Sequence, residues 1–298
     1  MRRRYPHEGE DRGAPHEILP QMKILYTTDL HGDAEKYKRL EDIALKARPA
    51  IVINGGDMLP KKVNLFQQDK FITGRLTAHF EFFQTAGIQY LCCPGNDDLK
   101  IFDDLFDETC NRFPLVTNLA QRRVEISGHE FIGMNWVVDY PFRLKDRCRK
   151  DKGDYVFQAQ MGSGLLSSEM GWRELADWQG YAATLPTIED ELQRLPRPLD
   201  MSRAIYVIHM PPYRLGLDKC RHGAEVGSAA VYEFLLKQQP LLSLHGHIHE
   251  SPEVTKVWKA KLGNTVCIQP GQLEDEFTYV LIDLVSMQFE KSPKGTGR

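Results

Sequence analysis

The 298-residue chain is 42% hydrophobic, 27% charged and 10% aromatic, which is ordinary for a globular protein. This composition excludes a largely disordered chain, a collagen-like fibre and a disulfide-stabilised miniprotein. Its 38 basic and 41 acidic residues leave a formal net charge of −3, so neither a nucleic-acid surface nor a membrane surface is indicated.

The N-terminal segment carries an Arg triplet with no apolar stretch behind it, which is not the pattern of a secretory signal. No run approaches the roughly 18 apolar residues that a membrane-spanning helix requires. Six cysteines are too few for a disulfide framework, and several lie within apolar runs, as buried thiols do. We therefore expect a cytoplasmic protein with flexible tails at 1–21 and 291–298 and a single domain over 22–290.

From Lys23 onwards, apolar β-rich runs alternate with patterns of helical period. A helix is expected over 37–47, ended by Pro49, and a longer helical region ends at Gly87. The alternation predicts an α/β fold with a mostly parallel sheet. A short helix near 99–110 follows, and a hairpin turning at Ser127-Gly128 adds antiparallel strands. The first three strands are expected over 23–28, 50–54 and 88–93.

Residues 140–200 are rich in charge, Gly and Pro and are interpreted as an insertion with one helix at 187–195. Its basic side chains from Arg143 to Lys152 are expected to form a solvated loop, with phosphate steering as the alternative. Trp172 and Trp178 are expected to form the small core of the insertion. Regular structure resumes with a strand at 203–209, a helix after Ser228, a strand at 240–246 and short strands up to Leu284.

Polar residues capable of chemistry follow five of the predicted strands. Since ligands gather outside the carboxyl ends of strands in α/β sheets, these segments are expected to converge. In an extended backbone, residues i and i+2 point to the same side, so a pair with that spacing can serve one centre. The segments are Asp29-Leu30-His31, Gly55-Gly56-Asp57, Gly95-Asn96-Asp97-Asp98, His209, and Gly246-His247-Ile248-His249.

The donors in these segments comprise four His, two Asp and one Asn, with no thiolate. Such a mixed nitrogen and oxygen set suits Mn, Fe, Zn, Co or Ni rather than a structural zinc–cysteine site. Seven ligands exceed what one tetrahedral ion accepts, and they fit two ions that share a bridging carboxylate.

The order D-x-H, GGD, GND, H, GHIH resembles that of the calcineurin-like metallophosphoesterases, and the segments GHIHES and GNTVCIQPG are most similar to the Icc-related branch. The resemblance covers about residues 22–285 apart from the insertion. It implies a two-sheet β-sandwich flanked by helices, two divalent metal ions with manganese the first choice, and a small phosphate-ester substrate, a nucleotide among the candidates. It leaves the oligomeric state open.

The resemblance also implies a role for each ligand. Asp57 would bridge two ions that activate a bridging hydroxide for in-line attack on a phosphodiester or phosphomonoester. The first ion would be held by Asp29, His31 and His249, and the second by Asn96, His209 and His247.

One position departs from the family pattern. Most members have His after the Gly-Asn pair, where this chain has Asp97. That His usually protonates the leaving group or contacts the phosphate, and an ionised Asp does neither. His222, in a loop that can reach the site, is a candidate substitute acid. The alternative to an enzyme is a metal-binding scaffold or interaction module on the same fold.

Two further polar residues have simpler interpretations. His245 precedes the Gly of GHIH and is expected to serve packing. Ser228 is expected to cap a helix whose start can also face the phosphate. The phosphate-binding loop, nucleophile-elbow, H-E-x-x-H and dinucleotide-binding motifs of competing chemistries are absent from the sequence.

Overall fold

The computed structural model describes residues 22–62 and 64–292. The predicted tail at 1–21 lies outside them, as does 293–298 of the C-terminal one. Lys291 and Ser292, predicted as part of that tail, instead belong to strand β16 (Gln288–Ser292). Among the described residues, no helix is both long and apolar enough to span a membrane.

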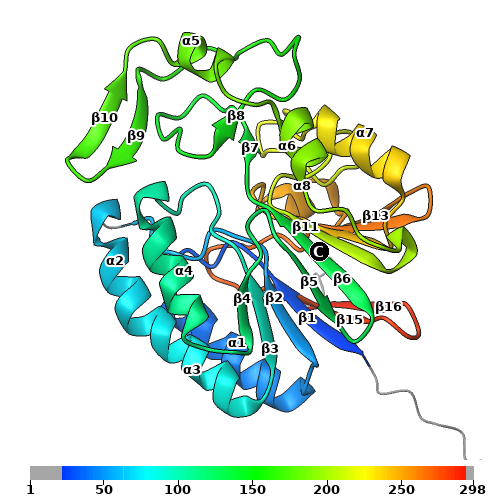
Figure 1. The fold of residues 1–298 in the computed structure, drawn as a ribbon. Coiled ribbons are helices and arrows are strands. Elements are labelled where there is room, and N and C mark those ends of the chain that lie inside the picture. Colours follow the sequence, from blue (N-terminus) through cyan, green and yellow to red (C-terminus); the bar gives the residue numbers. More distant parts are fainter. Residues whose placement is uncertain (1–21, 63, 293–298) are drawn as a thin grey trace, which may run out of the picture.

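Two six-stranded sheets form the centre of the molecule (Figure 1). The first has the order β16-β15-β1-β2-β3-β4. Its strands β1 to β4 are mutually parallel, whereas β15 and β16 are antiparallel to their neighbours. The bounds are β1 Lys23–Thr27, β2 Ile51–Asn54, β3 Gln89–Cys92, β4 Val116–Asn118 and β15 Tyr279–Asp283.

The second sheet has the order β13-β14-β12-β11-β6-β5, with β6, β11, β12 and β14 parallel. The predicted hairpin is confirmed, since Ser127 and Gly128 join β5 to β6 with φ of 50° and 74°. The bounds are β5 Arg123–Ile126, β6 His129–Met134, β11 Ala204–Ile208, β12 Leu242–Leu244, β13 Lys259–Leu262 and β14 Thr265–Ile268.

Alternation along the strands produces three apolar layers. Ile24 and Ile53 of the first sheet and Val207 of the second belong to the core between the sheets. Leu25 and Val52 point the other way, into the core shared with the first helical layer. The chain is therefore a two-sheet α/β sandwich flanked by helices, as expected (Figure 1).

The helices form two layers, one for each sheet. The first layer comprises α1 (Ala34–Ala47), α2 (Gln68–Phe71), α3 (Thr77–Ala86) and α4 (Asp103–Asn111). Beside them lie the 3₁₀ helices η1 (Leu65–Gln67) and η3 (Lys100–Phe102) and the π-helical segment η2 (Ile72–Leu76). The second comprises α5 (Trp178–Ala183), α6 (Ile188–Arg194) and α7 (Ala229–Gln238); η4 (Met201–Arg203) and α8 (Ser251–Thr255) complete the helical segments.

The insertion contributes β8 (Cys148–Arg149), which pairs with β7 (Val137–Val138) just before it. A hairpin of β9 (Gly164–Ser168) and β10 (Gly171–Leu175) then projects from the sandwich (Figure 1). Trp178 is buried as predicted, at 3% exposure, but it belongs to the core of the second sheet and its helical layer and not to a separate core of the insertion. The prediction is wrong for Trp172, which is 41% exposed and packs edge-on against Phe66 with ring centroids 4.8 Å apart.

The basic stretch of the insertion is only partly the solvated loop that its charge predicts, since Arg143 is exposed as expected but three other members are not. Lys145, Arg147 and Arg149 are buried, because each has a carboxylate partner supplied by tertiary structure that a local charge count does not reveal. Arg147 Nε also donates to the carbonyl of Gly95 at 2.8 Å, which fastens the insertion to the loop after β3. The pairs are Lys145–Asp139, Arg147–Asp103 and Arg149–Glu191.

These buried pairs predict a large stability cost for removing one partner. Asp139→Ala leaves the Lys145 ammonium buried without its carboxylate and should lower the free energy of unfolding by about 3–5 kcal/mol, measured by urea denaturation. Glu174→Ala is the matched control, because the Arg143–Glu174 pair is exposed and contributes at most about 1 kcal/mol. Equal losses for the two variants would contradict a structural role for the buried pair.

Candidate metal centre

All seven candidate ligands follow the carboxyl ends of parallel strands. Three of these strands belong to the first sheet and two to the second, and the two sheets end at the same edge of the sandwich. Side chains from both sheets therefore meet there, as the sequence predicts. Asp29 and His31 follow β1, Asp57 follows β2, Asn96 follows β3, His209 follows β11, and His247 and His249 follow β12.

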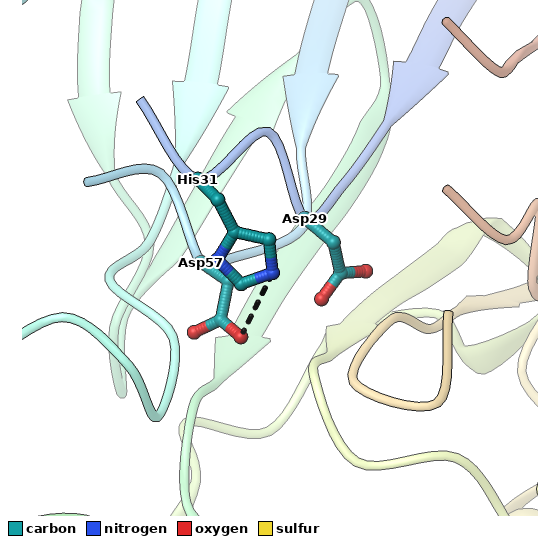
Figure 2. Close-up of side chains that lie close together, drawn as sticks. All are labelled: Asp29, His31 and Asp57. Atoms are coloured by element: carbon teal, nitrogen blue, oxygen red, sulfur yellow. Dashed lines mark ion pairs between the residues drawn. The ribbon is translucent and has the colours of Figure 1, made fainter. Parts of the chain in front are cut away.

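A first group of side chains gathers around the end of β1. Asp29, His31 and Asp57 can each offer one ligand atom, and these atoms lie within 4.8 Å of one another (Figure 2). His31 Nε2 is 3.9 Å from Asp57 Oδ2. The His249 ring lies nearby, with its centroid 5.8 Å from that of His31.

A second group of side chains also adjoins Asp57. The Asn96 Oδ1 atom is 2.6 Å from His247 Nδ1 and 3.1 Å from His209 Nε2. His209 Nε2 is in turn 3.5 Å from Asp57 Oδ2. Asp57 thus adjoins both groups, which is the arrangement that a shared bridging ligand requires.

The backbone reaches this arrangement differently from the extended conformation that the i, i+2 spacing predicts. Asp29, His31, Asp57 and His247 have φ of 57°, 46°, 52° and 68°. The expectation of extended backbone is therefore wrong at these positions, although the side chains do converge. Left-handed conformations are uncommon in residues other than glycine and concentrate at functional sites, so their presence here supports a functional role.

Two glycines are required by close approach within this group. A Cβ on Gly95 would lie 2.2 Å from Asp57 Oδ1, and one on Gly56 would lie 2.5 Å from His209 Nδ1. Only hydrogen at these positions allows the loops after β2, β3 and β11 to approach one another.

Without a bound cation, burial and neighbouring charges leave the donors in different ionisation states, and His209 would have to lose a proton before it could bind an ion. Burial opposes ionisation of Asp57, but His209 outweighs it and holds the pKa of this carboxyl well below its usual value. Burial likewise opposes the charged form of His209, yet Asp57 and Asp29 raise its pKa to about 9. Burial lowers the pKa of His31 and of His247 to about 3, so both are neutral imidazoles with a lone pair available.

Asp98, which sequence reasoning assigned no role, organises the loops beneath the ligands. Its carboxylate accepts from the backbone N–H groups of Met58, Leu59 and Gly95 at 2.8–2.9 Å. It therefore ties the loop after β2 to the loop after β3. An acidic residue in a Gly-Asn turn was the only signal in the sequence.

Asp97 lies inside the site, where it touches both groups. Its backbone N–H donates to Asp57 Oδ1 at 2.8 Å, and its Oδ1 accepts from the Asn96 amide at 2.9 Å. Burial, with a further contribution from Asp57, raises the pKa of Asp97 to about 7.

Lys61 is a site residue that the sequence analysis missed. Its Nζ atom lies 2.8 Å from His31 Nε2 and 3.7 Å from Asp97 Oδ2. The only signal in the sequence is its position four residues after Asp57 on the same loop. A solvent-exposed lysine could stand at that position equally well, so the signal is weak. Its ammonium partly offsets the negative charge of Asp97 in the site.

The other predicted residues have distinct positions. His222 is exposed on the wall of a cavity that also contains Asp97, and within the described ranges it has no hydrogen bond to a candidate ligand.

His245 is fully buried and its Nδ1 lies 3.0 Å from the Ile208 carbonyl, which confirms its packing role. Ser228 caps α7 as predicted, but Asp151 accepts from Ser228 and from the N–H of Ala229. That carboxylate occupies the helix start, so the expectation that it faces phosphate is wrong.

Comparison with known proteins places this geometry in context. A family model described as calcineurin-like phosphoesterase matches residues 22–251. No curated protein sequence matches. One solved crystal structure has a TM-score of 0.60 at 17% identity, covering 91% of this chain and 98% of its own. The protein TT1561 of Thermus thermophilus has a TM-score of 0.55 at 19% identity with the same coverages. A dimetal phosphatase from Danio rerio has a TM-score of 0.49 at 11% identity, covering 89% of this chain and 93% of its own.

The two groups of ligands predict separable losses of metal. His249→Ala should empty the position beside Asp29 and His31, and His247→Ala the position beside Asn96 and His209. Each variant should retain about one manganese ion per chain, measured by elemental analysis after dialysis against limiting metal. The double variant should retain none. If both single variants lost the same ion, the double variant would still retain about one ion per chain. That result would contradict the assignment of the two histidines to different ions.

Proposed function

Since this chain belongs to the calcineurin-like phosphoesterase family, we propose that it hydrolyses phosphodiester or phosphomonoester bonds with two divalent metal ions. The observation that carries the proposal is the position of Asp57 between two groups of nitrogen and oxygen donors. A binding scaffold has no need of two complete donor groups around one carboxylate.

The donor set fits cations on two physical grounds. Asp29 Oδ2 and His31 Nδ1 are buried without a hydrogen-bond partner among the described residues, an arrangement that costs free energy unless another group satisfies them. Asp29 and Asp57 also place two carboxylates together at 1% and 2% exposure. Divalent cations stabilise such a concentration of buried negative charge.

We assign the ligands by proximity. Asp29, His31 and His249 would hold one ion, and Asn96, His209 and His247 the other, with Asp57 shared. Imidazole and carboxylate donors are compatible with Mn, Fe, Zn, Co and Ni, and manganese is our first choice. When bound, such ions supply an activated water and stabilise the charge that develops on the phosphoryl group.

The protein side chains around the ligands would orient the ester. The Asp97 N–H and His209 fix the carboxylate of Asp57, so its position does not depend on substrate. The Lys61 ammonium lies beside His31 and Asp97 and would bind a non-bridging phosphoryl oxygen. Asp97 alone would repel a phosphate, and Lys61 would offset that repulsion. His222 stays a candidate for protonating the leaving group from the cavity wall.

The proposal is tested with metal-free protein reconstituted separately with each of the five metals. Aryl and alkyl phosphomonoesters and phosphodiesters are offered as substrates, and Asp57→Asn is the matched inactive variant. We expect hydrolysis by the reconstituted wild type and nearly none by the variant, whose thermal unfolding should show an intact fold. A wild type that binds two ions but hydrolyses no ester would favour a scaffold instead.

The position of Lys61 generates a separate prediction. Lys61→Met should raise the inhibition constant of inorganic phosphate about 10-fold, because one charge-assisted hydrogen bond is lost. Lys62→Met is the control, since Lys62 is exposed and pairs with Glu274 instead of a candidate ligand. Phosphate inhibition that is unchanged in Lys61→Met, with unchanged metal content, would exclude the lysine from phosphate binding.

A further inference from the structure

A cavity of about 570 Å³ opens from the candidate metal ligands into the space between the insertion and the loop after β11. Asp57, Asn96 and His247 are among its lining residues. This volume falls within the range of small-molecule sites. The cavity is therefore large enough to hold the organic part of an ester whose phosphoryl group reaches the ligands.

The wall contributed by the insertion is aromatic and begins at a candidate ligand. The Tyr140 ring centroid is 5.9 Å from that of His247, and the Phe142 ring follows at 5.8 Å from Tyr140. Met210 and Val226 line the same cavity. Phe142 is 59% exposed, so the outer part of this wall presents a large apolar ring to the cavity and to solvent.

The aromatic wall is held in place by the buried ion pair of the insertion. Lys145 Nζ bonds Asp139 at 2.7 Å, lies 5.0 Å from the Tyr140 ring centroid and also donates to the Tyr140 carbonyl. Asp139 further accepts from the Trp178 indole at 2.8 Å. The wall therefore exists before any ligand binds, which reduces the entropy cost of binding.

The charges that line this cavity discriminate against a second anionic group. Lys61 is the one Lys or Arg among its lining residues in the described chain. Glu250 also lines the cavity, whereas the Asp139 carboxylate is paired with Lys145. A neighbouring cavity of about 520 Å³, beside Asp29 and His31, differs because it also contains Lys36, Lys62 and Arg221. An uncharged aromatic group thus complements the first cavity better than a phosphate or carboxylate does.

We propose that this cavity is a leaving-group site for planar aromatic groups, and that the preferred substrates are esters with one phosphoryl group and an otherwise uncharged aromatic moiety. This inference rests on the proposed function for the phosphoryl end of the site. Tyr140 and Phe142 would contact the aromatic ring, while the candidate metal ligands and Lys61 would contact the phosphoryl group.

The test measures binding of phosphonates, which share the phosphoryl head but have a C–P bond that this chemistry does not break. Methylphosphonate, 2-naphthylphosphonate and a carboxylated naphthylphosphonate are titrated calorimetrically into manganese-loaded protein. We expect the naphthyl compound to bind at least about 10-fold more tightly than the methyl compound. The added carboxylate should remove most of that gain, because Glu250 lines the cavity and Lys61 is the one Lys or Arg that does so in the described chain.

Phe142→Ala should weaken naphthylphosphonate about 3- to 10-fold and leave methylphosphonate unchanged. Met170→Ala is the matched control, since Met170 is an exposed apolar residue of the same insertion outside the cavity lining. Equal affinities for the methyl and naphthyl compounds, or equal losses for both in Phe142→Ala, would overturn the inference. Hydrolysis is measured in parallel. A wild type that cleaves no ester overturns the proposed function, whereas the phosphonate affinities test separately whether the cavity binds aromatic groups.

Discussion

The structure depends on one electrostatic constraint: two carboxylates, Asp29 and Asp57, are buried where the ends of both sheets meet. Like charges so close together in a buried site destabilise the fold unless positive charge or hydrogen-bond donors compensate. His209 from the second sheet lies 3.5 Å from Asp57, and the Asp97 N–H donates to the same side chain. The site is therefore part of what holds the sheets in their relative position.

Residues around the two buried carboxylates hold the neighbouring loops in place. Gly95, after β3, allows close contact with Asp57, and Gly56, after β2, allows close contact with His209. Asp98 ties the loops after β2 and β3 together by accepting from their backbone N–H groups. A direct bond also joins the sheets, because the Tyr26 hydroxyl donates to the carbonyl of His245 at 2.7 Å. The ligands are thus positioned by rigid strands and braced loops, which suits catalysis that relies on fixed charges.

Buried charges also fix the insertion against the rest of the fold. Arg147 connects it to Gly95 and Asp103, and Asp151 caps α7 in the second helical layer. These buried charges fix the segment that carries Tyr140 and Phe142 beside His247. The proposed phosphoryl and leaving-group sites would in this way share one rigid boundary.

Strand alternation predicts the α/β elements and strand-end chemistry predicts the convergence of ligands, because both are local signals, whereas the two-sheet sandwich was implied by the family resemblance. The hairpin at Ser127-Gly128 follows from turn chemistry in the same manner. Tertiary partners cannot be seen locally, so the burial of Lys145 and the cap that Asp151 provides for α7 were missed. Lys61 was missed because only the fold brings its ammonium to His31.

The most direct measurement of the central claim is a crystal structure of the manganese-loaded protein with anomalous scattering data. Two anomalous peaks about 3.5–4 Å apart are expected. The Asp57 carboxylate should lie within about 2.0–2.4 Å of both peaks, with His249 beside one and His247 beside the other. A single peak, or two peaks that do not share Asp57, would contradict the dinuclear centre on which the proposed function depends.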